Sequence, residues 1–175
     1  MLLGAMLEEF DSHLFKEAVN FFTECLHIDN SVPVEVKIVD NLGRGKTCGT
    51  CQPIFDKGDK LEKIKIQIKF YPATTGMIEC LAHEMVHAQQ WIQGRLTLKT
   101  EKVHLILGLI PITNYRLLWK GSDISDTPYY EKPSEVEAHL MQRQMTKAFL
   151  EYMGDTVKAD TMAGLFEKIL DSEDE

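Results

Sequence analysis

The chain has 175 residues, of which 44% are hydrophobic and 26% charged, and its formal net charge at pH 7 is −8. This length and composition predict one soluble globular domain with a core of useful size. The negative charge argues against autonomous binding to nucleic acid or anionic membrane, because phosphate binding usually needs a basic face.

Targeting and redox features indicate a cytoplasmic protein. The longest apolar run, at residues 105–112, contains glycine and proline and is far shorter than the roughly 20 residues of a membrane-spanning helix. Residues 1–7 lack the basic segment of a signal peptide. The chain's cysteines are too few and scattered for a disulfide framework. We expect no membrane partner, and the oligomeric state stays open.

The predicted elements begin with an amphipathic helix at residues 5–27, where apolar side chains have helical spacing. Residues 31–40, 46–55 and 62–70 predict three short strands of a mainly antiparallel sheet. The third strand alternates isoleucine with lysine or glutamine most clearly. A helix then runs from residue 74 or 75 to about 93, and Gly94 is its stop signal.

The second half of the chain predicts an excursion followed by a strong helix. Residues 95–120 indicate irregular structure or a hydrophobic hairpin, and residues 120–133 indicate a loop. A helix begins near Ser134 and ends before Gly154, and a short helix at 161–170 follows. The acidic end, about 170–175, predicts a flexible tail. Residues 1–175 therefore predict a single α+β domain.

The motif HEMVH, at residues 83–87, indicates the chemistry. Positions i and i+4 of a helix lie on one face, so His83 and His87 can present two imidazoles to one point. Zinc accepts imidazole nitrogen and prefers four ligands. Glu84 can take a proton from water at such a metal and return it to a leaving amine. The alternative is that the two histidines are ordinary core or surface residues.

A third protein ligand must come from elsewhere, with the fourth position left for water. The candidates outside the motif are His104, Glu135, Glu137 and His139. His104 precedes an apolar run and has no helical partner. His139 could equally be a ligand, a partner of a ligand or a surface residue.

The start of the last predicted helix offers the two glutamates. Ser134 and Glu137 have the spacing of a capping box, which gives Glu137 a structural role. Glu135 would lie in the first turn, where a carboxylate also offsets the helix dipole. The small Ala138 would let this helix approach the motif helix closely. Spacing alone slightly favours Glu135 and leaves the other candidates open.

Cys48 and Cys51 have the spacing of a zinc knuckle or a redox pair. A structural zinc needs about four ligands, and the sequence holds no second pair. On a regular strand the two side chains would point to opposite faces, whereas a turn would bring them together. The role of the pair stays open, and Cys80 is predicted to be a core residue.

Three segments resemble a group of small phage-encoded zinc metallopeptidases. They are HEMVHAQQWIQGRL at 83–96, WKG at 119–121 and YYEKPSEVEAH at 129–139, and the resemblance covers roughly residues 30–145. Such proteins are similar to SprT-like peptidases and to gluzincins of the ImmA type, which have small zincin-like domains. The position before Glu135 is often tryptophan in them and is Ser134 here, a departure that removes no ligand.

The resemblance implies a zinc-dependent peptidase acting on proteins or peptides, in the host cytoplasm if the chain is phage-encoded. By likeness to ImmA-type peptidases Glu135 would be the third ligand, whereas a SprT match would use a third histidine. The substrate would lie along an edge strand, either the strand at 62–70 or its neighbour. Tyr130, or with less weight Tyr129, would donate to the oxyanion, unless it is a packing residue.

Two other functions fit the same residues. One is a SprT-like protease that acts on DNA-associated proteins, which the negative charge disfavours. The other is a metal-stabilised phage protein that binds a host factor without catalysis. The presence of Glu84 disfavours the second function, because a pure binder needs no general base.

Overall fold

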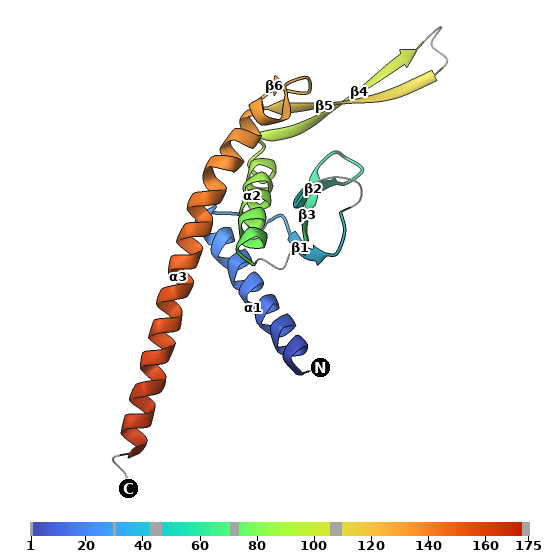
Figure 1. Ribbon diagram of the computed structural model, residues 1–175. Helices are drawn as coiled ribbons and strands as arrows, with labels where there is room; N and C mark the ends of the chain where they lie inside the picture. Colours follow the sequence, from blue (N-terminus) through green and yellow to red (C-terminus); the bar gives the residue numbers. More distant parts are fainter. Residues whose placement is uncertain (1, 30, 43–46, 71–73, 106–109, 173–175) are drawn as a thin grey trace.

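Figure 1 shows the computed structural model, which describes residues 2–29, 31–42, 47–70, 74–105 and 110–172. Side chains are described within residues 13–29, 31–42, 47–70, 75–100 and 114–154. In chain order the elements are α1 (Leu2–Cys25), β1 (Val34–Val39), β2 (Gly49–Phe55), β3 (Leu61–Lys69), α2 (Thr74–Ile92), β4 (Leu96–Leu105), β5 (Ile110–Trp119), β6 (Ser122–Asp123), the 3-10 helix η1 (Tyr129–Glu131) and α3 (Pro133–Ser172). The predicted α+β class is confirmed.

Helix α2 is the middle layer of the molecule. Helices α1 and α3 pack against it on one side, and the sheet of β1, β2 and β3 lies on the other (Figure 1). Almost every residue from 77 to 91 is buried, as expected for a helix covered on both sides. The helix ends at Ile92, and Gly94 just beyond it has a φ of +65°. The N–H of Gly94 donates to Trp91 and that of Arg95 to Gln90, a Schellman motif that confirms the predicted stop.

The first sheet has the strand order β1-β3-β2 and is mixed, since β1 is parallel and β2 antiparallel to β3. The predicted alternation of β3 is confirmed: Ile64, Ile66 and Ile68 are buried, while Lys65 is exposed. Because β3 is paired on both sides, the predicted strand at 62–70 cannot offer a free edge. Its neighbour β2 is an edge strand of this sheet. Pro53 within β2 fits that position, because proline cannot donate a ladder hydrogen bond.

The core joins all three layers near the middle of α2. Phe22 of α1 and Phe149 of α3 are fully buried, with ring centroids 5.7 Å apart. Ile78 and Leu81 of α2 are also fully buried. Ala138 has no exposed surface, in agreement with the predicted close approach of α3 to the motif helix. This packing sets the first turns of α3 against the HEMVH face of α2.

The segment at 95–120 forms the β4–β5 hairpin, which projects from the body of the molecule (Figure 1). Of the two predicted possibilities for this segment, irregular structure or a hairpin, the structure confirms the hairpin. Within the apolar run at 105–112, residues 106–109 lie outside the described residues, as do the side chains of the others.

Helix α3 differs from the prediction at both ends. It begins at Pro133 and continues through Gly154 to Ser172, so the predicted separate helix at 161–170 is wrong. Proline suits a first helical position because its fixed φ is helical and that N–H would be unpaired anyway. A helical glycine costs only about 1 kcal/mol, so Gly154 alone does not have to end the helix. Residues 170–172 are helical rather than part of a tail, and 173–175 lie outside the described residues. Across the described part of the chain, no helix could cross a lipid bilayer.

Candidate metal centre

Helix α2 and the first turn of α3 bring His83, His87 and Glu135 together beside a cleft of about 770 Å³. The Nε2 atoms of the two histidines are 3.1 Å apart. The Oε2 atom of Glu135 lies 3.4 Å from each of them. Ligands at the corners of a tetrahedron with bonds of about 2.0–2.1 Å are about 3.3–3.4 Å apart. The cluster therefore has the size and the donor atoms of a site that could hold a metal ion.

Two glutamines decide which nitrogen of each imidazole carries the proton. The Nδ1 atom of His83 is 2.7 Å from Oε1 of Gln142, and that of His87 is 2.8 Å from Oε1 of Gln90. The amide nitrogens of these glutamines donate to other acceptors, namely Glu79, the Ser134 carbonyl and Glu137. Since those bonds fix the amide orientation, each Oε1 accepts from Nδ1–H. Each Nε2 atom then keeps a lone pair directed at the cluster.

The cluster is electrostatically incomplete without a cation. The two Nε2 lone pairs converge on the same point as Oε2 of Glu135, which is buried and has no hydrogen-bond partner within the described residues. Acceptor atoms that face one another repel, and a buried polar atom left unpaired costs about 1–3 kcal/mol, or more if charged. A metal ion would supply the positive charge that these atoms lack.

Two carboxyl groups at the cluster differ in their protonation. Burial raises the pKa of Glu84 to about 7, against the opposing charges of His87 and His83. Burial also raises the pKa of Glu135. His83 and His87 outweigh this effect when they carry the positive charge that a metal would otherwise supply, and they hold that pKa well below its usual range. One carboxylate is thus ionised beside the histidines, while the other can take and release a proton near neutral pH.

Comparison with models of known protein families, with curated proteins and with solved structures finds no match for this chain. The resemblance to phage metallopeptidases stays a prediction, and function has to be inferred from the geometry of the cluster.

Glu137 lies outside the cluster, on the far side of Gln90. It accepts a hydrogen bond of 2.7 Å from Arg95 and one of 2.9 Å from Gln90. The predicted capping box is wrong because the helix starts one residue early, at Pro133, which puts Ser134 inside the first turn. Glu137 has a structural role, but its partner is Arg95 rather than the helix terminus.

The two remaining candidate histidines are not part of the cluster either. His139 is exposed and lines the cleft, with its ring centroid 4.8 Å from that of His83. The backbone of His104 pairs with Pro111 in the β4–β5 hairpin, and its side chain lies outside the described residues.

The structure places Tyr129 closer to the cluster than Tyr130. The hydroxyl of Tyr129 is hydrogen-bonded to Glu135. Tyr130 is 78% exposed, and its ring stacks on His139 with centroids 6.2 Å apart. Both tyrosines line the cleft, so donation to an oxyanion by Tyr130 stays a prediction.

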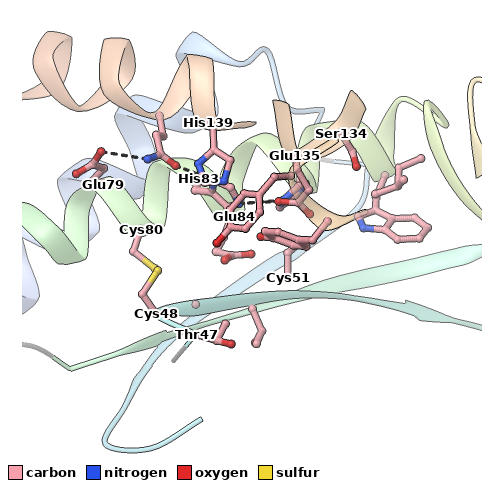
Figure 2. Close-up of a pocket in the computed structure, with 18 of the residues that line it drawn as sticks. Thr47, Cys48, Cys51, Glu79, Cys80, His83, Glu84, Ser134, Glu135 and His139 are labelled. Atoms are coloured by element: carbon pink, nitrogen blue, oxygen red, sulfur yellow. Dashed lines mark hydrogen bonds and ion pairs between the residues drawn. The ribbon is translucent and has the colours of Figure 1, made fainter. Parts of the chain in front are cut away.

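The start of β2 lines the cleft opposite α2. A Cβ atom on Gly49 would lie 2.7 Å from Sγ of Cys80 and 2.8 Å from Cγ of Glu84, so only glycine allows this approach. Next to it, the side chains of Cys48 and Cys80 point toward each other (Figure 2), and their thiols are hydrogen-bonded. That bond lowers the pKa of Cys48 to about 6. Cys80 is buried as predicted, but it also lines the cleft.

Replacing Gln142 with leucine should weaken zinc binding by about 10–100-fold, the usual cost of removing a partner that orients a ligand. Leucine cannot accept the Nδ1–H of His83, so the imidazole loses its fixed tautomer. Competition with a chromophoric chelator measures the change. The control is Gln144→Leu, on an exposed position of the same helix. Equal affinities for both variants would show that Gln142 does not orient the ligand.

Replacing Gly49 with alanine should lower turnover by up to about 10²-fold, because displacing a catalytic group by about 1 Å can cost that much. The new methyl group would collide with Glu84 and Cys80. Gly76→Ala is the matched control, since a Cβ there would meet nothing within 4 Å. Steady-state kinetics on both variants test the expectation, and unchanged kcat in Gly49→Ala would contradict it.

Proposed function

We propose that this protein is a zinc-dependent peptidase. The observation that supports this most is the position of Glu84, a buried carboxyl beside the converging donor atoms of His83, His87 and Glu135. Two imidazoles and one carboxylate would leave one of four ligand positions open. Catalytic zinc sites keep such an open position, whereas structural sites fill all four with protein ligands.

The residues divide the work of hydrolysis between them. When bound, zinc polarises a carbonyl and lowers the pKa of water towards about 7. Glu84 takes the proton from the attacking water and returns it to the leaving amine, which its pKa near neutrality suits. Gln142 and Gln90 hold the imidazoles in one tautomer, and Tyr129 holds the carboxylate of Glu135.

An extended polypeptide is the substrate class that fits the cleft. Strand β2 is an edge strand of its sheet, and residues 47–51 line the cleft opposite the cluster. A peptide that pairs with this edge gains backbone hydrogen bonds regardless of its sequence. A peptide bound along this edge would have its scissile bond in the cleft that residues 47–51 and Glu84 line.

Zinc content and zinc-dependent cleavage test the proposal together. Elemental analysis of the purified protein should give about one zinc per chain. Incubation with a peptide library prepared from a digested cell extract should produce new termini, detected by mass spectrometry. A chelator should abolish cleavage, and added zinc should restore it. Full zinc occupancy without cleavage would contradict the proposed peptidase activity. Absence of zinc after reconstitution would contradict the proposed zinc site.

A further inference from the structure

We propose that Cys48 and Cys80 form a redox-modification site on the wall of the cleft, where a hydroperoxide such as hydrogen peroxide converts the two thiols into a disulfide. Both cysteines are free in the structure. They come from different elements, the segment that enters β2 and the middle of α2, so a bond between them would join the two walls of the cleft.

The two thiols are held together by the fold. Their side chains point toward each other across the cleft (Figure 2), and each thiol is within hydrogen-bonding reach of the other. The carbonyl of Cys48 accepts a 2.8 Å hydrogen bond from Lys69 of β3, which fixes the backbone at that point. Gly49 allows the close approach, because a Cβ there would lie 2.7 Å from Sγ of Cys80. Little backbone movement is needed to bring the sulfur atoms into bonding distance.

The pair is asymmetric in a way that assigns a role to each thiol. Cys48 is exposed at the cleft, so a small oxidant can reach its sulfur, whereas Cys80 is buried behind it. The Cys80 thiol donates to Cys48, and a donor at that sulfur favours the thiolate, which is the reactive form. Cys48 is therefore the sulfur that attacks the peroxide, and Cys80 is the resolving thiol.

The chemistry balances in two steps. The sulfur of Cys48 attacks one peroxide oxygen, so an S–O bond forms, the O–O bond breaks and hydroxide leaves as water after taking a proton. The sulfur of Cys80 then attacks the sulfenic acid of Cys48. The S–S bond forms, the S–O bond breaks, and the hydroxyl leaves with the proton of Cys80 as a second water. Two thiols lose two electrons in total, and one peroxide becomes two waters.

The other cysteines are not suited to this reaction. Cys25 lies on α1, where burial and the nearby charge of Glu24 raise the pKa of its thiol. Cys51 has the sequence spacing of a redox pair with Cys48, but burial raises the pKa of its thiol well above the usual value. The tertiary contact thus selects Cys80 over the sequence neighbour Cys51.

The cross-link would close one end of the cleft, one helical turn before Glu84. Slower peptide hydrolysis in the oxidised protein is expected on that ground, and this consequence rests on the proposed function. The formation of the disulfide does not rest on the proposed function, because it requires neither bound zinc nor cleavage of a substrate.

Peptide mapping of the full-length protein tests the site. Trypsin places Cys48 in the peptide 47–57 and Cys80 in the peptide 70–95, so the expected product joins these two. After brief treatment with hydrogen peroxide and alkylation of free thiols, the joined peptide should appear at least about 10-fold faster than oxidation of Cys25. Dithiothreitol should separate it again.

Matched variants assign the bond. Cys51→Ala should retain the joined peptide, while Cys48→Ser and Cys80→Ser should lose it. In Cys80→Ser, Cys48 should stop at a sulfenic acid that dimedone traps. A bond between Cys48 and Cys51, or no joined peptide in wild type and Cys51→Ala, would overturn the proposal. A joined peptide in a protein that cleaves nothing would contradict only the proposed function, and cleavage without a joined peptide would contradict only the redox site.

Discussion

Replacing Glu84 with glutamine should lower peptide turnover by about 10²–10⁴-fold, the usual contribution of a general base, while zinc content stays at the wild-type level. Glutamine has nearly the same shape as glutamate but cannot take a proton from water. Glu84 is buried beside the cluster without being one of its converging ligands. The substitution therefore separates proton transfer from metal binding, and single-turnover kinetics with elemental analysis measures both.

Glu79→Gln is the matched control for that experiment. It makes the same change on the same helix and in the same cleft, and the new amide oxygen can still accept from Gln142. Turnover in this variant should stay within about 10-fold of wild type, since only one orienting hydrogen bond is altered. If Glu84→Gln retained as much activity as Glu79→Gln, another group would have to activate the water.

Replacing Glu135 with alanine should remove most of the zinc and with it all measurable turnover. The loss of affinity should exceed the roughly 10–100-fold that an orienting residue costs, because a ligand itself is removed. The variant should still fold, because Glu135 lines the cleft and is not part of the hydrophobic core. Thermal unfolding of the metal-free variant should still be a single cooperative transition, which separates loss of zinc from loss of the fold.

His139→Ala and Glu137→Ala serve as the comparison set. His139 lies near His83 but outside the cluster, so its removal should leave zinc content unchanged. Glu137 accepts from Gln90, which orients His87, so its loss should weaken binding by no more than about 10–100-fold. Zinc retained in Glu135→Ala but lost in either comparison variant would assign the third ligand to that residue.

The parts of the site that follow from local spacing could be predicted from the sequence. His83 and His87 share a helix face because they are four residues apart, and Glu84 is adjacent to the first of them. Gln90 follows His87 by three residues on the same face, so spacing alone could have identified it as a partner. Gln142 lies two turns after Glu135 on α3, and the same reasoning would have placed it beside the cluster.

Contacts between segments that are far apart in the sequence could not be predicted from local spacing. Cys48 and Cys80 meet because Gly49 lets a strand approach α2, and no sequence pattern records that distance. The partner of Glu137 is Arg95, which follows the helix stop of α2 and becomes a neighbour only after α3 packs. The parallel pairing of β1 with β3 likewise depends on tertiary packing, because both strand patterns fit either direction.

The cluster takes its donors from two helices that are separate in the chain, since His83 and His87 belong to α2 and Glu135 to α3. A cation there would act as a clamp between the layers, and the free energy of unfolding would depend on the free metal concentration. A ligand held at 100 times its Kd adds about 2.7 kcal/mol to a folded protein that alone binds it. In a cell with tightly buffered zinc, the stability of the folded chain would thus rise and fall with the metal supply.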